Sequence, residues 1–282
     1  MIMSGVSGWL KDKKSEWEDK KVNKIQNMID QKFGDFKKGL EKQLGKLGLS
    51  LTYAGISGSN ARARTGGTLI ARFNDSQGYP ITLFVSQQVY EGHPAGNLGF
   101  GDMLKVYWSW AIWGTIVPSS IPFTMLFKEV GRGFLKDMDK VFLPFAKDPS
   151  LAYAVGSPDE KKLFNSPLLQ TPVIAALNSD KKTCDNIAKL SLWCEVYLTH
   201  KASLTLKCED MAGKCSVVPF GDETAVFLRN YGNYGDPKRI LETMAGIRRN
   251  ILANPHTEKV NGLVPVPWVE NLHTICKATS LG

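Results

Sequence analysis

Side chains that could act in catalysis or bind a metal are few and scattered in this sequence. The four histidines lie far apart, and only His273 is close enough to a cysteine, Cys276, to share a helical face with it. One such pair without a third ligand is typical of ordinary packing. The chain has no G-x-S-x-G, Walker A or H-E-x-x-H motif, and no G-x-G-x-x-G between a strand and a helix. We therefore expect a protein that is not an enzyme and that holds no metal and no cofactor.

The five cysteines do not form a recognisable metal or redox motif. All of them follow residue 180, and none forms a C-x-x-C pair. The odd number, without a secretory signal, favours reduced thiols in the core. Cys208 and Cys215 flank a predicted hairpin turn and could form a disulfide in an oxidising compartment.

Two basic segments could bind phosphate groups. The loop GSNARARTGGT carries Arg62 and Arg64 among three glycines, and Arg248 and Arg249 are adjacent in a predicted helix. Guanidinium groups bind phosphates and lipid head groups well, although a flexible loop and a solvated helix face explain the same residues. The net charge of +8 favours a polyanionic partner. Nucleic acid is the less favoured one, because the Arg-rich and Trp-rich segments are separate.

The first 48 residues contain eleven lysines against seven acidic residues and show an apolar repeat of eleven residues. Steps of three and four residues place the apolar positions on one narrow side of a helix, with the lysines elsewhere. This amphipathic helix could lie in an anionic lipid interface with Trp9 and Trp17 as anchors, or pack on the protein's own body or on a partner. The apolar positions are Val22, Ile25, Ile29, Phe33, Phe36, Leu40, Leu44 and Leu47, and the lysines are Lys20, Lys24, Lys38, Lys42 and Lys46.

A second apolar segment, residues 106–127, has no charged residue. Pro118 and Pro122 interrupt it, so a membrane-spanning helix is not expected. We predict a strand over residues 103–117, with Trp113 on one face and Trp108 and Trp110 on the other, by simple alternation. Such a strand is either central in a covered sheet or contributes its tryptophans to a second contact surface.

The pattern as a whole predicts an α+β fold in three regions. Residues 1–48 form the helix. Residues 49–147 contain four antiparallel strands, up to residue 117, and then a helix over 120–142 that Ser120 would cap. Residues 148–282 contain a buried helix over 180–201, a hairpin, and a helix that Asp236 caps and Pro237 opens; we expect this α/β region to pack with the preceding one as a single body.

These observations favour a non-enzymatic structural or coat-like protein that binds an anionic membrane peripherally through its N-terminal helix. A structural subunit of a virion or other polymer, with the helix as an arm between subunits, is the first alternative. A pore-forming cytolysin is the second, since the arrangement resembles the architecture of the small α-helical members of that class. We expect a homo-oligomer in the cytosol, since the sequence has no secretory signal and no spanning helix.

Overall fold

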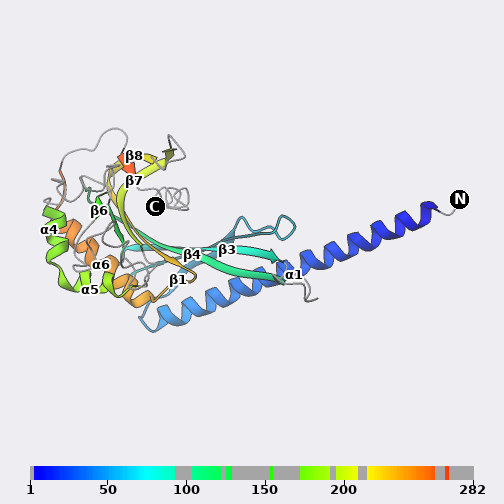
Figure 1. Cartoon of the computed structure of the whole chain (residues 1–282). Helices are drawn as coiled ribbons and strands as arrows, with labels where there is room; N and C mark the ends of the chain where they lie inside the picture. Colours follow the sequence, from blue (N-terminus) through cyan, green and yellow to red (C-terminus); the bar gives the residue numbers. More distant parts are fainter. Residues whose placement is uncertain are drawn as a thin grey trace, which may run out of the picture.

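The structure is a computed structural model that describes residues 3–92, 103–121, 125–128, 153–154, 172–190, 195–208, 215–257 and 264–266. It confirms the α+β fold: a long N-terminal helix is followed by an antiparallel sheet and further short helices (Figure 1). The elements are α1 (Met3–Gly45), β1 (Leu51–Ser57), β2 (Thr65–Asn74), β3 (Pro80–Gly92), β4 (Met103–Val117), β5 (Met125–Lys128), β6 (Tyr153–Ala154), α4 (Pro172–Ser179), α5 (Lys181–Ala188), β7 (Glu195–Cys208), β8 (Cys215–Tyr231), α6 (Pro237–Ala253) and β9 (Val264–Val266).

The described strands form one antiparallel sheet in the order β1-β2-β3-β4-β8-β7-β5-β6, with β9 paired to β8. The four strands predicted between residues 49 and 117 are confirmed as β1 to β4, joined by short connections in an antiparallel meander. The sheet then continues from β4 directly to β8, whose residues come from the C-terminal region. The two regions after the N-terminal helix therefore share a single sheet.

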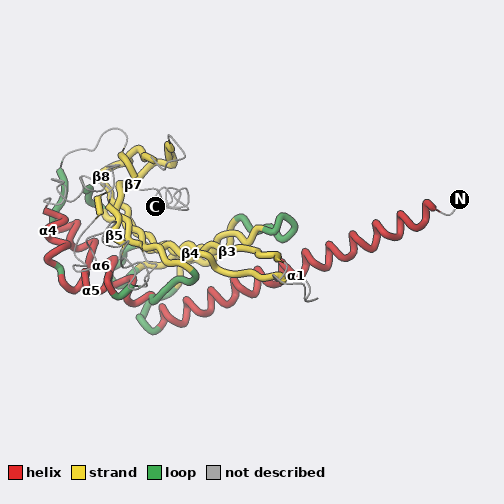
Figure 2. The backbone as a smooth tube through the Cα atoms, viewed as in Figure 1, coloured by secondary structure: helices red, strands yellow, loops and turns green. Residues whose placement is uncertain are grey.

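Helices cover one face of this sheet. The C-terminal half of α1 runs along β1 and β4, while α4, α5 and α6 pack against each other at the other end (Figures 1 and 2). Side chains of all four helices meet those of β2, β3, β4, β7 and β8 in one apolar core. The predicted stripe of α6 is confirmed, since Ile240, Met244, Ile247 and Ile251 are fully buried. Asp236 caps this helix as expected, with its carboxylate accepting from the Lys238 N–H.

Two helix predictions are wrong in part. Met125–Lys128 is strand β5, paired with β7, and Ser120 lies in an isolated bridge with His256 instead of capping a helix; residues 129–142 lie outside the described residues. Helix α5 ends at Ala188, and the chain from Glu195 is strand β7. Apolar residues at steps of four, such as Leu190, Cys194 and Leu198, fit the period of a helix and that of a strand equally well, and the strand-forming residues of this segment pair with β8.

Candidate functional site

The apolar stripe of α1 is buried in the protein's own core. Ile25, Ile29, Phe36, Leu40 and Leu44 are at most 1% exposed. Val22, Phe33 and Leu47 are partly buried against the same core clusters. In this structure the stripe is therefore unavailable to lipid, which corresponds to the alternative that the helix packs on its own body. The helix ends as Gly48 adopts a left-handed conformation with φ of 71°.

A close approach explains one glycine of α1. A Cβ on Gly39 would lie 2.8 Å from the hydroxyl oxygen of Tyr234, whereas nothing lies within 4 Å of the corresponding position at Gly34. The Tyr234 ring packs edge-on against Phe36 and is tilted against Trp108, and burial raises the pKa of its hydroxyl. Gly39 thus lets α1 approach the loop that leads into α6.

The predicted alternation of the tryptophans is wrong because β4 contains a bulge. Its pairing with β3 shifts between Trp110 and Trp108, which leaves Ser109 as an additional residue. Trp108 consequently shares the helix-covered face with Trp113, whose indole N–H donates to the Tyr234 carbonyl oxygen at 2.7 Å. Trp110 is 4% exposed and Trp113 fully buried, while Trp108 is partly buried. These indoles do not form an exposed contact surface.

The arginines of the Gly-rich loop are engaged in ion pairs with acidic residues. Arg62 lies 3.2 Å from Asp19 of α1, and Arg64 pairs with Glu91 at the end of β3. Lys21 of α1 pairs with Glu91 as well. The two arginines predicted to bind anions therefore help to hold the loop against the helix.

The second arginine pair is also engaged internally, but in two different ways. Arg248 is 1% exposed, lies 2.8 Å from Asp75 in the β2–β3 turn, and stacks on the ring of Tyr79 with 3.7 Å to its centroid. Arg249 is 64% exposed and pairs with Asp180, the N-cap residue of α5. The adjacent arginines thus connect α6 to two separate parts of the fold.

Asp180 has a strongly lowered pKa. Burial raises the pKa of its carboxyl group, but hydrogen bonds from the Thr183 side chain and from Asn250, each 2.8 Å long, outweigh burial. Further hydrogen bonds from the Thr183 N–H and from Arg249 contribute, and the pKa falls to about 2. The carboxylate is therefore charged at neutral pH and joins α5 to α6.

The outer face of α1 carries a row of lysines, which we call the lysine row. At about 100° per residue its members fall within an arc of roughly 80° on the side opposite the buried stripe. All of them are exposed, and Asp35 is the one acidic residue on the same arc. The lysine row consists of Lys20, Lys24, Lys38, Lys42 and Lys46 and, at 1.5 Å per residue, extends over about 39 Å.

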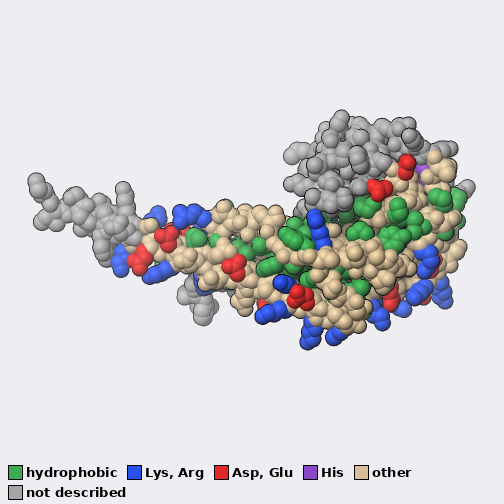
Figure 3. All heavy atoms as spheres, turned by 180° about the vertical axis from the view of Figure 1, so that it is seen from behind, with side chains coloured by type: hydrophobic (Ala, Val, Ile, Leu, Met, Phe, Trp, Pro, Cys, Tyr) green, Lys and Arg blue, Asp and Glu red, His purple; other side chains and the backbone are tan. Residues whose placement is uncertain are grey.

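The N-terminal part of α1 projects beyond the sheet (Figure 1). Trp17 lies on the same arc as the lysine row and is 54% exposed, with the Lys21 ammonium 4.8 Å from its ring centroid. Lys20 pairs with Glu16 at 2.8 Å, but both are well exposed, so the pair contributes little to stability. Figure 3 shows basic side chains along this projecting part and again along the lower edge of the body. Trp9 belongs to the same helix, but its side chain lies outside the described residues.

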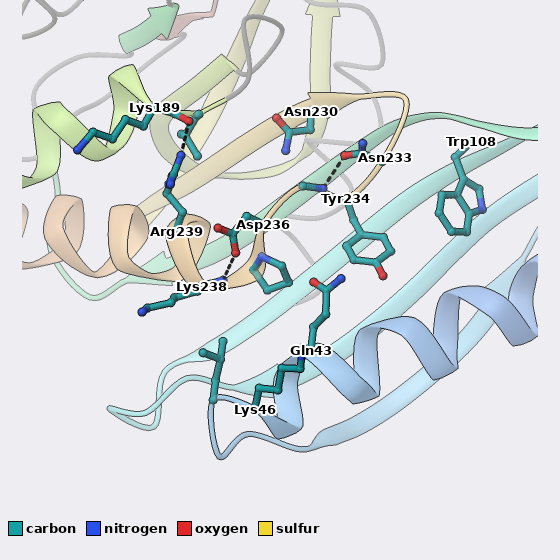
Figure 4. Close-up of a pocket in the computed structure, with 14 residues that line it drawn as sticks. Gln43, Lys46, Trp108, Lys189, Asn230, Asn233, Tyr234, Asp236, Lys238 and Arg239 are labelled. Carbon is teal, nitrogen blue, oxygen red and sulfur yellow. Dashed lines mark hydrogen bonds between the residues drawn. The ribbon is translucent and has the colours of Figure 1, made fainter.

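A cleft of about 1030 Å³ opens where α1 ends beside the start of α6 and the end of α5. Four basic side chains line it: Lys46, Lys189, Lys238 and Arg239 (Figure 4). Asp236, the one acidic side chain among the described residues that line it, is occupied as the cap of α6. We call this the basic cleft.

Aromatic and amide side chains complete the basic cleft. Trp108 and Tyr234 lie along one wall, with Gln43 of α1 approaching the Tyr234 ring (Figure 4). Arg239 donates to the Lys189 carbonyl oxygen at 2.7 Å, which fixes the guanidinium at the rim, and the Asn233 side chain accepts from the Gly235 N–H at 2.8 Å. The basic cleft therefore combines cations with neutral hydrogen-bonding groups and flat apolar surface.

Among the described residues, no three His, Cys, Asp or Glu side chains come close enough to hold a metal ion. No protein-family model matches the sequence, and neither a curated protein nor a solved structure shows significant similarity to it.

Proposed function

We propose that the protein is a non-enzymatic, coat-like component that binds an anionic membrane peripherally through the lysine row of α1. One observation carries the proposal: the solvent face of a straight helix presents five exposed lysines and a single acidic residue over about 39 Å. A flat negative surface is the partner that can contact all five at once. The side chains that contact the head groups are thus not the apolar ones that the sequence pattern favoured.

The helix can bind in this way without leaving the body. Its apolar stripe remains in the core, and a lysine near an anionic leaflet contributes about 1 kcal/mol. Five such contacts give about 5 kcal/mol, which is enough for reversible attachment that weakens as salt screens the charges. Trp17 lies on the same arc, at the projecting end, where an indole suits the boundary between head groups and acyl chains. Among the described residues no helix is long and apolar enough to cross a bilayer, in keeping with attachment at the surface.

Vesicle co-sedimentation tests this proposal. The full-length protein should pellet with vesicles that contain phosphatidylserine and stay in the supernatant with pure phosphatidylcholine. Binding should fall steeply as the salt concentration rises. Equal binding to both vesicle types, or binding that salt leaves unchanged, would contradict attachment through the lysine row. Release of a trapped dye would instead indicate a pore former.

A second candidate is a subunit of a larger assembly, with α1 as an arm between subunits. The projecting part of α1 favours it, because Lys13 to Trp17 are all exposed and Trp17 is a large apolar side chain with 54% of its surface exposed. In that case the protein should form oligomers without lipid, and Trp17→Ser should dissociate them. Light scattering during size-exclusion chromatography decides between the two candidates, since a protein that is monomeric at every concentration has no such arm contact.

A further inference from the structure

The basic cleft differs from the two arginine pairs described above in how its charges are matched. Arg62, Arg64, Arg248 and Arg249 are each paired with a carboxylate from another element. By contrast, in the part of the chain that the structure describes, no carboxylate forms an ion pair with any of the three lysines of the basic cleft. Among the described residues, carboxylates neutralise these four arginines and leave the concave cluster of lysines positive.

The three lysines of this cluster are exposed, so their charges face the solvent at the mouth of the basic cleft. Like charges that line one concavity repel each other, and low-dielectric walls strengthen the field they produce. The three lysines lie on separate segments, Lys46 near the end of α1, Lys189 after α5 and Lys238 in α6, so no single helix requires their proximity. The N-terminus of α6 is not part of this anion site, because Asp236 already caps it.

We propose that the basic cleft binds a small ligand that carries two or more phosphate groups. Among the described residues, four cations face one carboxylate, which is engaged in capping α6, and this excess of positive charge matches such a ligand. A guanidinium beside ammonium groups suits phosphate oxygens. A volume of about 1030 Å³ exceeds what a single phosphate needs and fits a phosphorylated ring or short carbon chain. The wall of Trp108 and Tyr234 offers flat apolar surface to the carbon skeleton.

This ligand could be a soluble metabolite or the head group of a phosphorylated lipid, since both present the same phosphates. The proposal does not depend on membrane attachment through the lysine row, because the two surfaces share only Lys46. A protein that fails to bind phosphatidylserine vesicles can still bind the small ligand, and the reverse also holds.

Isothermal titration calorimetry of the full-length protein with inositol trisphosphate tests the proposal. We expect saturable binding with a Kd in the micromolar range, about 1–100 μM. Lys189→Glu/Lys238→Glu should weaken binding at least about tenfold, because two contacts become repulsive. The matched control is Lys181→Glu/Lys182→Glu, which changes the net charge equally on exposed positions of α5 outside the basic cleft, and it should retain binding.

A second variant protects the test from a folding artefact. Lys46→Glu reverses a charge directly after the end of α1, at the opposite side of the basic cleft, and should also weaken binding while the far-ultraviolet circular dichroism stays unchanged. No heat at ligand concentrations up to about 1 mM would overturn the proposal. Equal weakening in the α5 control would overturn it too, because binding would then follow net charge alone.

Neutral phosphatidylcholine vesicles with and without a phosphoinositide distinguish the two sources of the ligand. Binding to the phosphoinositide vesicles, lost in Lys189→Glu/Lys238→Glu, would support the head group. Binding of the free trisphosphate without binding to these vesicles would support a soluble metabolite. Absence of both would overturn the proposal and leave the phosphatidylserine experiment unaffected.

Discussion

The adjacent arginines of α6 allow one contact to be tested against its own neighbour. Arg248→Ala removes a guanidinium that is 1% exposed and leaves the Asp75 carboxylate, itself 8% exposed, without its cation. Loss of one partner of a buried ion pair costs about 3–5 kcal/mol. The stacking on Tyr79 is lost as well and adds about 0.5–2 kcal/mol. We therefore expect Arg248→Ala to lower the free energy of unfolding by at least about 3 kcal/mol.

Arg249→Ala is the matched control, since it removes the same side chain one residue later. Arg249 is 64% exposed, and exposed ion pairs contribute about 0.2–1 kcal/mol. Urea denaturation followed by circular dichroism measures both variants. Equal losses would refute the assignment of Arg248 as a buried anchor. In a double-mutant cycle, Asp75→Ala combined with Arg248→Ala should cost less than the sum of the single changes, because the carboxylate no longer remains uncompensated.

Three smaller changes test contacts elsewhere. Gly39→Ala should lower stability by about 1–2 kcal/mol, because its Cβ would meet the hydroxyl oxygen of Tyr234, whereas Gly34→Ala should raise stability by up to about 1 kcal/mol; equal thermal shifts would contradict the close approach. Asp180→Asn should destabilise at neutral pH and not near pH 2: the lowered pKa provides stability above the unfolded pKa of about 4, and this is lost as pH falls through about 2. Denaturation of the wild type and of Asp180→Asn at a series of pH values measures this difference in stability. A difference that persists near pH 2 would contradict the lowered pKa of Asp180. Cys208 and Cys215 are direct partners in the β7–β8 register, so mild oxidation should remove two free thiols by titration, and an unchanged thiol count would exclude the bond.

The sequence was sufficient to predict an element of the fold where a local pattern of residues was compatible with only one type of secondary structure. The eleven-residue repeat predicted α1 because its period lies close to that of a helix. Asp236 and Pro237 located the start of α6 because each acts on the backbone beside it. Alternating β-branched and aromatic residues predicted β1 to β4 for the same local reason.

Where tertiary contacts decided the outcome, the sequence prediction failed. Leu190 and Leu198, eight residues apart, could not show whether the chain after α5 was helix or strand, and pairing with β8 decided it. The bulge at Ser109 reversed the face of Trp108, and nothing in the alternation of apolar residues indicated it. The acidic partners of Arg62 and Arg248 lie 43 and 173 residues away in the sequence, at Asp19 and Asp75, so both arginines seemed available to an outside anion.

The basic cleft could not be predicted because its cations come from separate stretches of the chain. Lys46, Lys189 and Lys238 are ordinary surface lysines when each is considered within its own segment. The lysine row was visible as the polar side of the predicted helix, but the sequence did not reveal that the apolar side would be buried. Because the apolar stripe of α1 is buried, the membrane contact that we propose is made by the lysine row and not by the stripe.

The most direct test of the central proposal compares two charge reversals on phosphatidylserine vesicles. Lys24→Glu/Lys42→Glu changes the lysine row, and Lys181→Glu/Lys182→Glu makes the same change in net charge on α5. At about 1 kcal/mol for each lysine, the first variant should lower the partition constant at least about 30-fold, while the second should stay close to the wild type. Equal binding by the two variants would contradict attachment through α1.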